Sequence, residues 1–334
     1  MTAARSGVVL QGAYPPDEFT GMVERIEGLG FDNLWLTDSS LHARNVYAYL
    51  TLAASHSSTL QLGTAVTNPL TRHPAITAVA TATVDEISGG RMVLGIGAGD
   101  RPLLALGLDP ARLETVRHAI EAVRALWAGE TLSMQDRAFM FDEAHSRVVA
   151  RADIPIFLSA SGPKMLELAG EIGDGVIVLV GLFADGLAWA IEQVQRGATA
   201  AGRPRPHVAV FAYGAIDEDE DAALESARTI AAWFPQTAPM VCELWGLAPG
   251  LVAAVRDAYR GGEFQEAAAA AKLLPDDFVR EVALAGGREQ ARGRIEAALA
   301  AGADSVHVFP LGQRRMETVE AFVACFRDVV GVRA

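Results

Sequence analysis

The hydrophobic positions along the chain alternate between short apolar runs and longer segments with helical periodicity. Short, near-continuous apolar runs are typical of strands buried on both faces, as in a parallel sheet. They predict strands at residues 8–10, 33–36, 60–62, 92–94, 154–157, 176–179, 208–211 and 306–309. The amphipathic segments between them predict helices, among them residues 17–29, 75–87, 113–127 and 290–301.

This alternation of about eight strands with about eight helices predicts an α/β fold, a (β/α)8 TIM barrel. Two insertions are expected. Residues 129–149 predict a hairpin after the fourth strand, and the alanine-rich residues 233–278 predict extra helices between strand seven and helix eight. No linker divides residues 1–334, so we expect a single domain. A doubly wound open sheet stays an alternative, because alternation alone does not prove closure.

Composition and charge argue against several classes of binding partner. The chain has 334 residues, with 41 acidic against 28 basic side chains and a net charge of −13, which argues against binding to nucleic acid or to an anionic membrane surface. Two cysteines exclude a disulfide-framed scaffold and fit a reducing cytosol. Neither a signal peptide nor an apolar run long enough to span a membrane is visible. We expect a cytosolic protein that acts on a small molecule.

Polar and glycine residues gather where the predicted strands end, which is where TIM barrels place their active sites. They are Asp38, residues 64–69, residues 95–100 and residues 161–164. Asp38 is either a site residue or a helix cap. The glycines of residues 95–99 are misplaced for a dinucleotide motif. Residues 161–164 either bind an anion at a helix N-terminus or form a simple turn. Lys164 favours the anion, because the only other lysine is Lys272.

The sequence shows no motif for a metal site, a catalytic nucleophile or a nucleotide-binding loop. The seven histidines show no metal-ligand spacing, so we expect no metal, and neither a nucleophile elbow nor a Walker loop is present. A site rich in small residues and poor in reactive side chains indicates a cofactor that performs the chemistry.

Several motifs together resemble the bacterial-luciferase-like superfamily of flavin and deazaflavin enzymes. The match covers nearly the whole chain in the right order, through LGFDNLWLTD at residues 29–38, LGTAVTNP at 62–69, RHPA at 72–75, DEISGGR at 85–91, LGIGAGD at 94–100, SGPK at 161–164 and AGEIGDG at 169–175. Within this superfamily, the sequence most resembles the methylene-tetrahydromethanopterin reductase branch, which uses the deazaflavin coenzyme F420. This resemblance is carried by residues 66–69, 72–74 and 162–164.

The resemblance implies a barrel with the cofactor at its C-terminal mouth, usually in a homodimer. It implies a non-proline cis peptide at Ala65–Val66 behind the deazaflavin ring. By the same matching, the cofactor-binding residues are Asp38, Ala65, Val66, Thr67, Asn68, Ala98, Gly99, Ser161, Gly162, Pro163 and Lys164. Asp38 and Asn68 would bond the ring, Ala98 and Gly99 would approach it through their backbone, and residues 161–164 would hold the phosphate of the tail.

Two departures from the related sugar-phosphate dehydrogenase branch argue against a sugar-phosphate substrate. Ser39 stands where that branch has a catalytic histidine, and residues 179–182 are apolar where it has a lysine. By the same resemblance, Asp100 stands where that branch has an acidic residue and would handle a proton, so Asp38 and Asp100 are the candidate catalytic residues.

We therefore expect a hydride transfer between reduced coenzyme F420 and an organic substrate with a C=N or activated C=C bond. The alternatives are an FMN-dependent monooxygenase and a cofactor-free barrel that acts as a binding protein.

Overall fold

The computed structural model describes residues 4–39, 41–259 and 264–331, and its main sheet is parallel. All eight strands expected from the sequence are present: β1 (Arg5–Gln11), β2 (Asn33–Thr37), β3 (Gln61–Thr64), β4 (Met92–Ile96), β7 (Ile156–Ala160), β8 (Gly175–Val178), β9 (His207–Ile216) and β11 (Ser305–Pro310). Their order is β9, β11, β1, β2, β3, β4, β7 and β8, and β8 pairs with β9 in turn. The sheet therefore closes on itself, which confirms the (β/α)8 barrel and excludes the open sheet.

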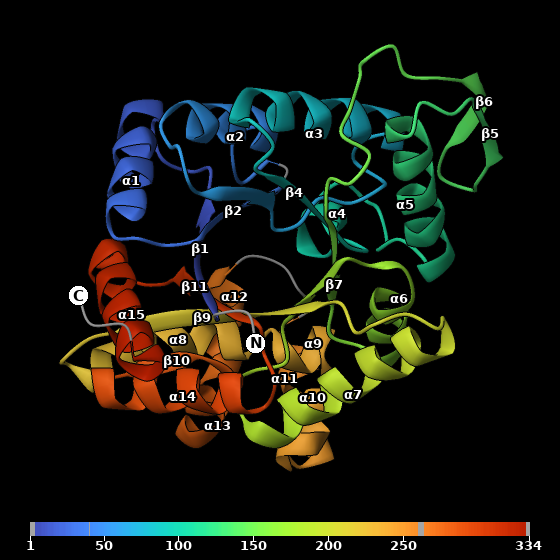
Figure 1. Ribbon diagram of the computed structural model, residues 1–334. Helices are drawn as coiled ribbons and strands as arrows, with labels where there is room; N and C mark the ends of the chain where they lie inside the picture. The colour runs from blue at the N-terminus through green and yellow to red at the C-terminus, as the bar shows by residue number, and fades with distance from the viewer. Residues whose placement is uncertain (1–3, 40, 260–263, 332–334) are drawn as a thin grey trace. The chain divides into compact units, whose positions relative to one another are not determined.

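The chain divides into two compact parts, of which residues 9–159 and 172–175 form one. In this part α1 (Pro16–Gly28), α2 (Val46–Ser55), α3 (Pro74–Ser88) and α5 (Leu113–Trp127) follow the strands. Neighbouring helices pack on one another, α2 on α3 and α3 on α5 (Figure 1). The apolar faces of these helices are buried, as the amphipathic pattern predicts, and α2 and α3 contact β2, β3 and β4. The bounds of α5 coincide with the predicted residues 113–127.

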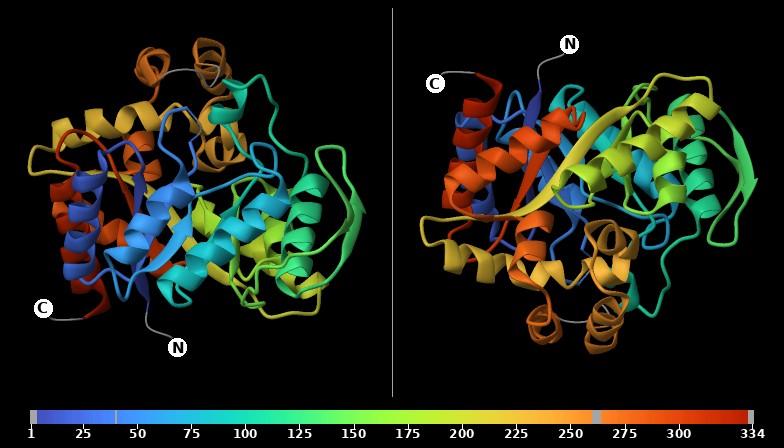
Figure 2. Two further views of the ribbon diagram at one scale, coloured as in Figure 1. Left: turned by 90° about the horizontal axis from the view of Figure 1, so that it is seen from above. Right: turned by 90° about the horizontal axis from the view of Figure 1, so that it is seen from below.

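The hairpin expected after the fourth strand is also present. β5 (Leu132–Gln135) pairs antiparallel with β6 (Met140–Ala144), and Gln135 lies opposite Met140. Both views in Figure 2 show this hairpin running along α5, on which it packs. A short helix, α4 (Arg101–Leu104), precedes α5.

The second part comprises residues 1–8, 160–171 and 176–334. It contains the regular helices α6 (Pro163–Ile172), α7 (Ala184–Ala200), α8 (Glu220–Ala231), α14 (Arg288–Ala300) and α15 (Arg315–Val330). The predicted helical insertion is observed as α9 (Phe234–Thr237), α10 (Pro239–Trp245), α11 (Pro249–Ala258), α12 (Phe264–Ala271) and α13 (Asp276–Val282). Its helices pack around fully buried Phe234 and Phe278, whose ring centroids are 6.4 Å apart.

One strand of this part was not expected. β10 (Leu284–Gly286) follows α13 and pairs with the end of β9, at Gly214–Ile216. Its three residues contain no β-branched side chain, so neither its length nor its composition marks it as a strand. Within the described ranges of the chain, no helix is long and apolar enough to cross a membrane.

Candidate active site

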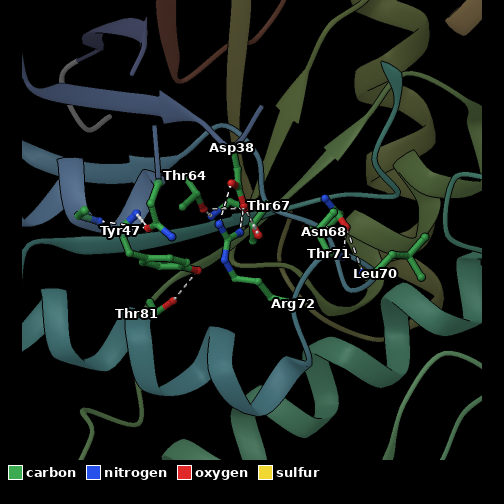
Figure 3. A network of polar contacts seen from close by, with 12 residues as sticks. Asp38, Tyr47, Thr64, Thr67, Asn68, Leu70, Thr71, Arg72 and Thr81 are labelled. Atoms are coloured by element: carbon green, nitrogen blue, oxygen red, sulfur yellow. Dashed lines mark hydrogen bonds and ion pairs between the residues drawn. The ribbon is translucent and has the colours of Figure 1, made fainter. Parts of the chain in front are cut away.

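The most prominent feature at the end of β2 is an ion pair between Asp38 and Arg72. Arg72 Nη2 donates to Asp38 Oδ1 at 3.0 Å, and Nη1 donates to Oδ2, so the contact is bidentate (Figure 3). Thr67 Oγ1 adds a third hydrogen bond, to Oδ2 at 2.8 Å. The Asp38 side chain is only 4% exposed and that of Arg72 18%. These three hydrogen bonds hold the carboxylate in one orientation.

The helix-capping alternative for Asp38 is excluded at α2, the helix that follows β2. The cap of α2 is Asn45, whose side chain accepts the backbone N–H groups of Tyr47 and Ala48. Asp38 instead faces the loop between β3 and α3, from which Thr67 and Arg72 reach it. Its contacts therefore link the ends of two neighbouring strands.

Tyr47 covers the other side of the Arg72 guanidinium. The Cζ atom of Arg72 lies 5.4 Å from the centroid of the Tyr47 ring, within the range of a cation–π contact. The Tyr47 hydroxyl lies 3.3 Å from Thr81 Oγ1 on α3, and burial raises the pKa of Tyr47 to about 12. The phenol therefore stays neutral at physiological pH, and Arg72 is fixed between a carboxylate and an uncharged ring.

The end of β3 contains the expected backbone feature. The Ala65–Val66 peptide bond is cis, as the resemblance predicts. Directly after it, the Thr67 N–H donates to the carbonyl of Gly95 at 3.0 Å, and the Gly97 N–H donates to the carbonyl of Thr67 at 3.0 Å. These bonds join the end of β3 to the end of β4.

The glycines of β4 have a packing role. A Cβ atom on Gly95 would lie 1.9 Å from the carbonyl oxygen of Thr64, so only glycine allows β3 and β4 to approach this closely. Gly99 has a φ of +83°, in the left-handed region that favours glycine. The candidate residues Ala98, Gly99 and Asp100 follow at the end of the strand, and all three are half-buried.

Asn68 forms a turn with its own loop. Its Oδ1 accepts the backbone N–H groups of Leu70 at 3.0 Å and Thr71 at 2.9 Å. This Asx turn holds the segment that leads directly to Arg72. The structure thus gives Asn68 a positioning role, while its contact with a cofactor ring stays a prediction.

This site contains two residues that are not among the candidates predicted from the sequence. Arg72 belongs to the RHPA motif, and an arginine at a strand-end loop is itself a signal of a site. The second is Thr37, the residue before Asp38, whose buried Oγ1 has no hydrogen-bond partner among the residues that the structure describes.

Thr37 lies two residues beyond Trp35 and therefore on the same face of β2. The centroid of the Trp35 ring lies 5.7 Å from that of Phe157 of β7, with the two rings tilted, so this face of β2 is turned toward β7. A buried hydroxyl without a partner is unfavourable by about 1–3 kcal/mol, which a ligand hydrogen bond would offset.

The predicted anion site lies at the start of α6, in the other part of the chain. Ser161 Oγ donates to the carbonyl of Leu179 at 2.9 Å, and the carbonyl of Gly162 accepts the Leu166 N–H at 3.0 Å. Pro163 is the first residue of α6, and both Pro163 and Lys164 are exposed. A Cβ atom on Gly162 would meet no atom of the described residues within 4 Å, so the space beside this turn is open there.

Comparison with known proteins provides the context for this geometry. A family model described as luciferase-like monooxygenase matches residues 1–305. The chain is 35% identical to a 5,10-methylenetetrahydromethanopterin reductase from Methanolobus tindarius over 300 residues, which cover 88% of this chain and 90% of that protein. The reductase of the same name from Archaeoglobus fulgidus is 35% identical over 305 residues, with 89% and 91% covered.

A solved structure has the same architecture. The coenzyme F420-dependent tetrahydromethanopterin reductase from Methanopyrus kandleri matches with a TM-score of 0.83 and 27% identity, over 97% of this chain and 98% of that one.

Proposed function

The chain belongs to the luciferase-like monooxygenase family, and we propose that it is an oxidoreductase that uses coenzyme F420. Its reaction would be a hydride transfer between the reduced deazaflavin and an organic substrate with a C=N or activated C=C bond. The observation on which this proposal rests is the 35% identity to two 5,10-methylenetetrahydromethanopterin reductases along about nine-tenths of the chain. The sequence motifs at the strand ends favour the same branch of the family.

The residues at the two candidate regions fit such a coenzyme. The turn at Gly162 is open, Lys164 adds a positive charge beside it, and the first N–H groups of α6 have no acceptor within the helix. A phosphate would bind to such a group of donors. At the end of β2, the buried Thr37 hydroxyl offers a hydrogen bond to a ring heteroatom. The hydrogen-bond donors of both regions are therefore compatible with the coenzyme.

When bound, coenzyme F420 supplies the carbon that gives or takes the hydride. The protein's residues orient the reactants and exclude water. A Cβ atom on Gly97 would lie 3.2 Å from both Val66 and Ser159, so the strand ends form a closely packed wall. The Asp38–Arg72 pair adds a neutral, fixed polar surface beside Thr37. Asp100 would hold or release a proton at its carboxylate where the substrate needs one.

The competing candidate is an FMN-dependent monooxygenase, because the family description names monooxygenases. The two differ in their use of oxygen, since a deazaflavin lacks the ring nitrogen at which flavins activate it. The protein should oxidise reduced coenzyme F420 in the presence of a cyclic imine or an activated alkene, with no oxygen uptake at an oxygen electrode. Oxygen uptake with reduced FMN, and no turnover of reduced coenzyme F420, would favour the monooxygenase.

We also propose that the protein is a homodimer. The outer face of α3 exposes Ile76 by 60%, Val79 by 37% and Ile87 by 47%, and these residues follow one another at helical spacing. An exposed apolar helix face of this kind is typical of subunit contacts. Sedimentation velocity should give a dimer, and Ile76→Glu with Val79→Glu should convert it to a monomer. A wild-type monomer would disprove this proposal.

A further inference from the structure

We propose that His73 is a positioning residue, through which the β5–β6 hairpin fixes the Arg72–Asp38 pair for coenzyme binding. The inference rests on the proposed function for the identity of the ligand. His73 is joined to Arg72 by one peptide bond and is the N-cap residue of α3. The hairpin, by contrast, is an insertion that contributes no strand to the barrel.

Both ring nitrogens of His73 are engaged, and their partners define one tautomer. Nδ1 lies 3.2 Å from the backbone nitrogen of Ala75, which is a donor, so Nδ1 must accept. Nε2 lies 3.1 Å from the carbonyl oxygen of Met140, which is an acceptor, so Nε2 must donate. Only the neutral imidazole with its hydrogen on Nε2 satisfies both bonds. One ring therefore caps α3 and bonds the hairpin at the same time.

Aromatic packing fixes the plane of this imidazole. Its centroid lies 4.7 Å from that of Phe141 and 5.8 Å from that of Phe139, and both contacts are edge-on. The two phenylalanines are themselves 5.9 Å apart and are 5% and 6% exposed. The ring is therefore held by two buried side chains of the hairpin in addition to its hydrogen bonds.

The hairpin has its own anchor on α5. Asp136 accepts hydrogen bonds from Thr115 Oγ1 at 3.1 Å and from the Ala138 N–H at 2.9 Å, and it lies 2.9 Å from His118 Nδ1. Burial opposes ionisation of Asp136, but these hydrogen bonds outweigh it and lower the pKa of its carboxyl. The carboxylate thus remains charged and holds the hairpin turn to α5.

These contacts form a continuous path from α5 through the hairpin and His73 to Arg72. The Arg72 guanidinium must meet Asp38 in a bidentate geometry, and the position of its backbone depends on where α3 begins. The Asx turn of Asn68 holds the loop before Arg72, and His73 holds the residue after it. Loss of the hairpin contact would remove only the second of these restraints, the one at His73.

The test uses variants that separate the cap from the hairpin contact. His73→Asn keeps a side-chain acceptor for the Ala75 N–H but does not reach Met140 or the phenylalanine rings. Phe141→Ala removes the packing from the hairpin side. Met140→Ala is the matched control, because the Met140 side chain is 60% exposed and its carbonyl is retained. Val116→Ala, at a fully buried position of α5, is the control for general destabilisation.

Two readouts are needed, one of them without ligand. In the free protein, hydrogen exchange of a peptide covering residues 68–76 should accelerate in His73→Asn and Phe141→Ala and stay unchanged in Met140→Ala. The Kd for coenzyme F420 should rise about fivefold in the first two variants, the effect of one lost neutral hydrogen bond. It should stay unchanged in both controls.

The inference is overturned if His73→Asn or Phe141→Ala leaves exchange and affinity as in the wild type. It is also overturned if Val116→Ala raises the Kd as much as they do, because His73 would then have only a structural role. A wild-type protein that does not bind coenzyme F420 would refute the proposed function instead, and hydrogen exchange would still report on the path to Arg72.

Discussion

The Asp38–Arg72 pair allows a quantitative prediction, because both partners are largely buried and each meets the other in two hydrogen bonds. In Asp38→Ala the guanidinium loses its counter-ion but remains beside the Tyr47 ring. Breaking a fully buried pair costs about 3–5 kcal/mol. Arg72 is 18% exposed and can recruit water, so we expect the free energy of unfolding to fall by about 2–3 kcal/mol, which lies at or below the lower end of that range.

A double-mutant cycle measures the pair itself. Asp38→Ala, Arg72→Ala and the double variant would be unfolded in urea at neutral pH, with the free energy of unfolding compared at zero denaturant. The double variant should be less destabilised than the sum of the single variants, with a coupling energy of about 2 kcal/mol. Additivity to within about 0.5 kcal/mol would refute the pair as a structural unit. Asp38→Ala should also weaken coenzyme binding, and unchanged affinity would leave Asp38 with a structural role alone.

Four further outcomes follow from single residues. Lys164→Ala should weaken the binding of intact coenzyme F420 by roughly tenfold to a hundredfold, the value of one charge-assisted phosphate contact, but should barely affect the binding of a deazaflavin without its phosphate tail. An equal loss of affinity for both ligands in titrations would show that Lys164 does not contact the phosphate. Asp100→Asn should lower kcat more than it raises the Kd, and unchanged steady-state turnover would remove Asp100 from the catalytic residues. Thr37→Val should leave the melting temperature unchanged or higher while it weakens coenzyme binding, and unchanged affinity would show that the hydroxyl does not meet the ligand. Burial lowers the pKa of His307 well below its usual 6.5, so at low pH the unfolded chain binds a proton that the native chain does not. The free energy of unfolding should therefore be highest above pH 6.5 and fall by up to about 1.4 kcal/mol per pH unit below it. In His307→Phe, denaturation at several pH values should show a shallower dependence of this free energy on pH.

The strands and helices of the barrel could be predicted because each buries a regular face. Leu34 and Leu36 are fully buried in β2, and the apolar positions of α5 lie on one side of that helix. Period and length alone mark such segments. β10 lacks both signals, and it is a strand only because Gly214–Ile216 of β9 offer it a partner. That partner is about 70 residues away in the sequence, so no local pattern reports it.

The candidate site could be located from the sequence but its contacts could not. The strand-end positions of Asp38 and Asn68 follow from the barrel, and the cis peptide at Ala65–Val66 follows from the family resemblance. The pairing of Asp38 with Arg72 joins residues 34 positions apart and depends on the conformation of the whole loop between β3 and α3. The Asx turn of Asn68 depends on the same loop. Side-chain partners of this kind are set by tertiary structure, and no local pattern in the sequence identifies them.

The most direct test of the proposed function is a titration of the wild-type protein with coenzyme F420 and with FMN, followed by fluorescence quenching of each ligand under identical conditions. We expect saturable binding of coenzyme F420 and at least tenfold weaker binding of FMN, a difference of about 1.4 kcal/mol or more. Preferential binding of FMN would contradict the proposed deazaflavin chemistry, and binding of neither ligand would leave the barrel as a binding protein without a cofactor.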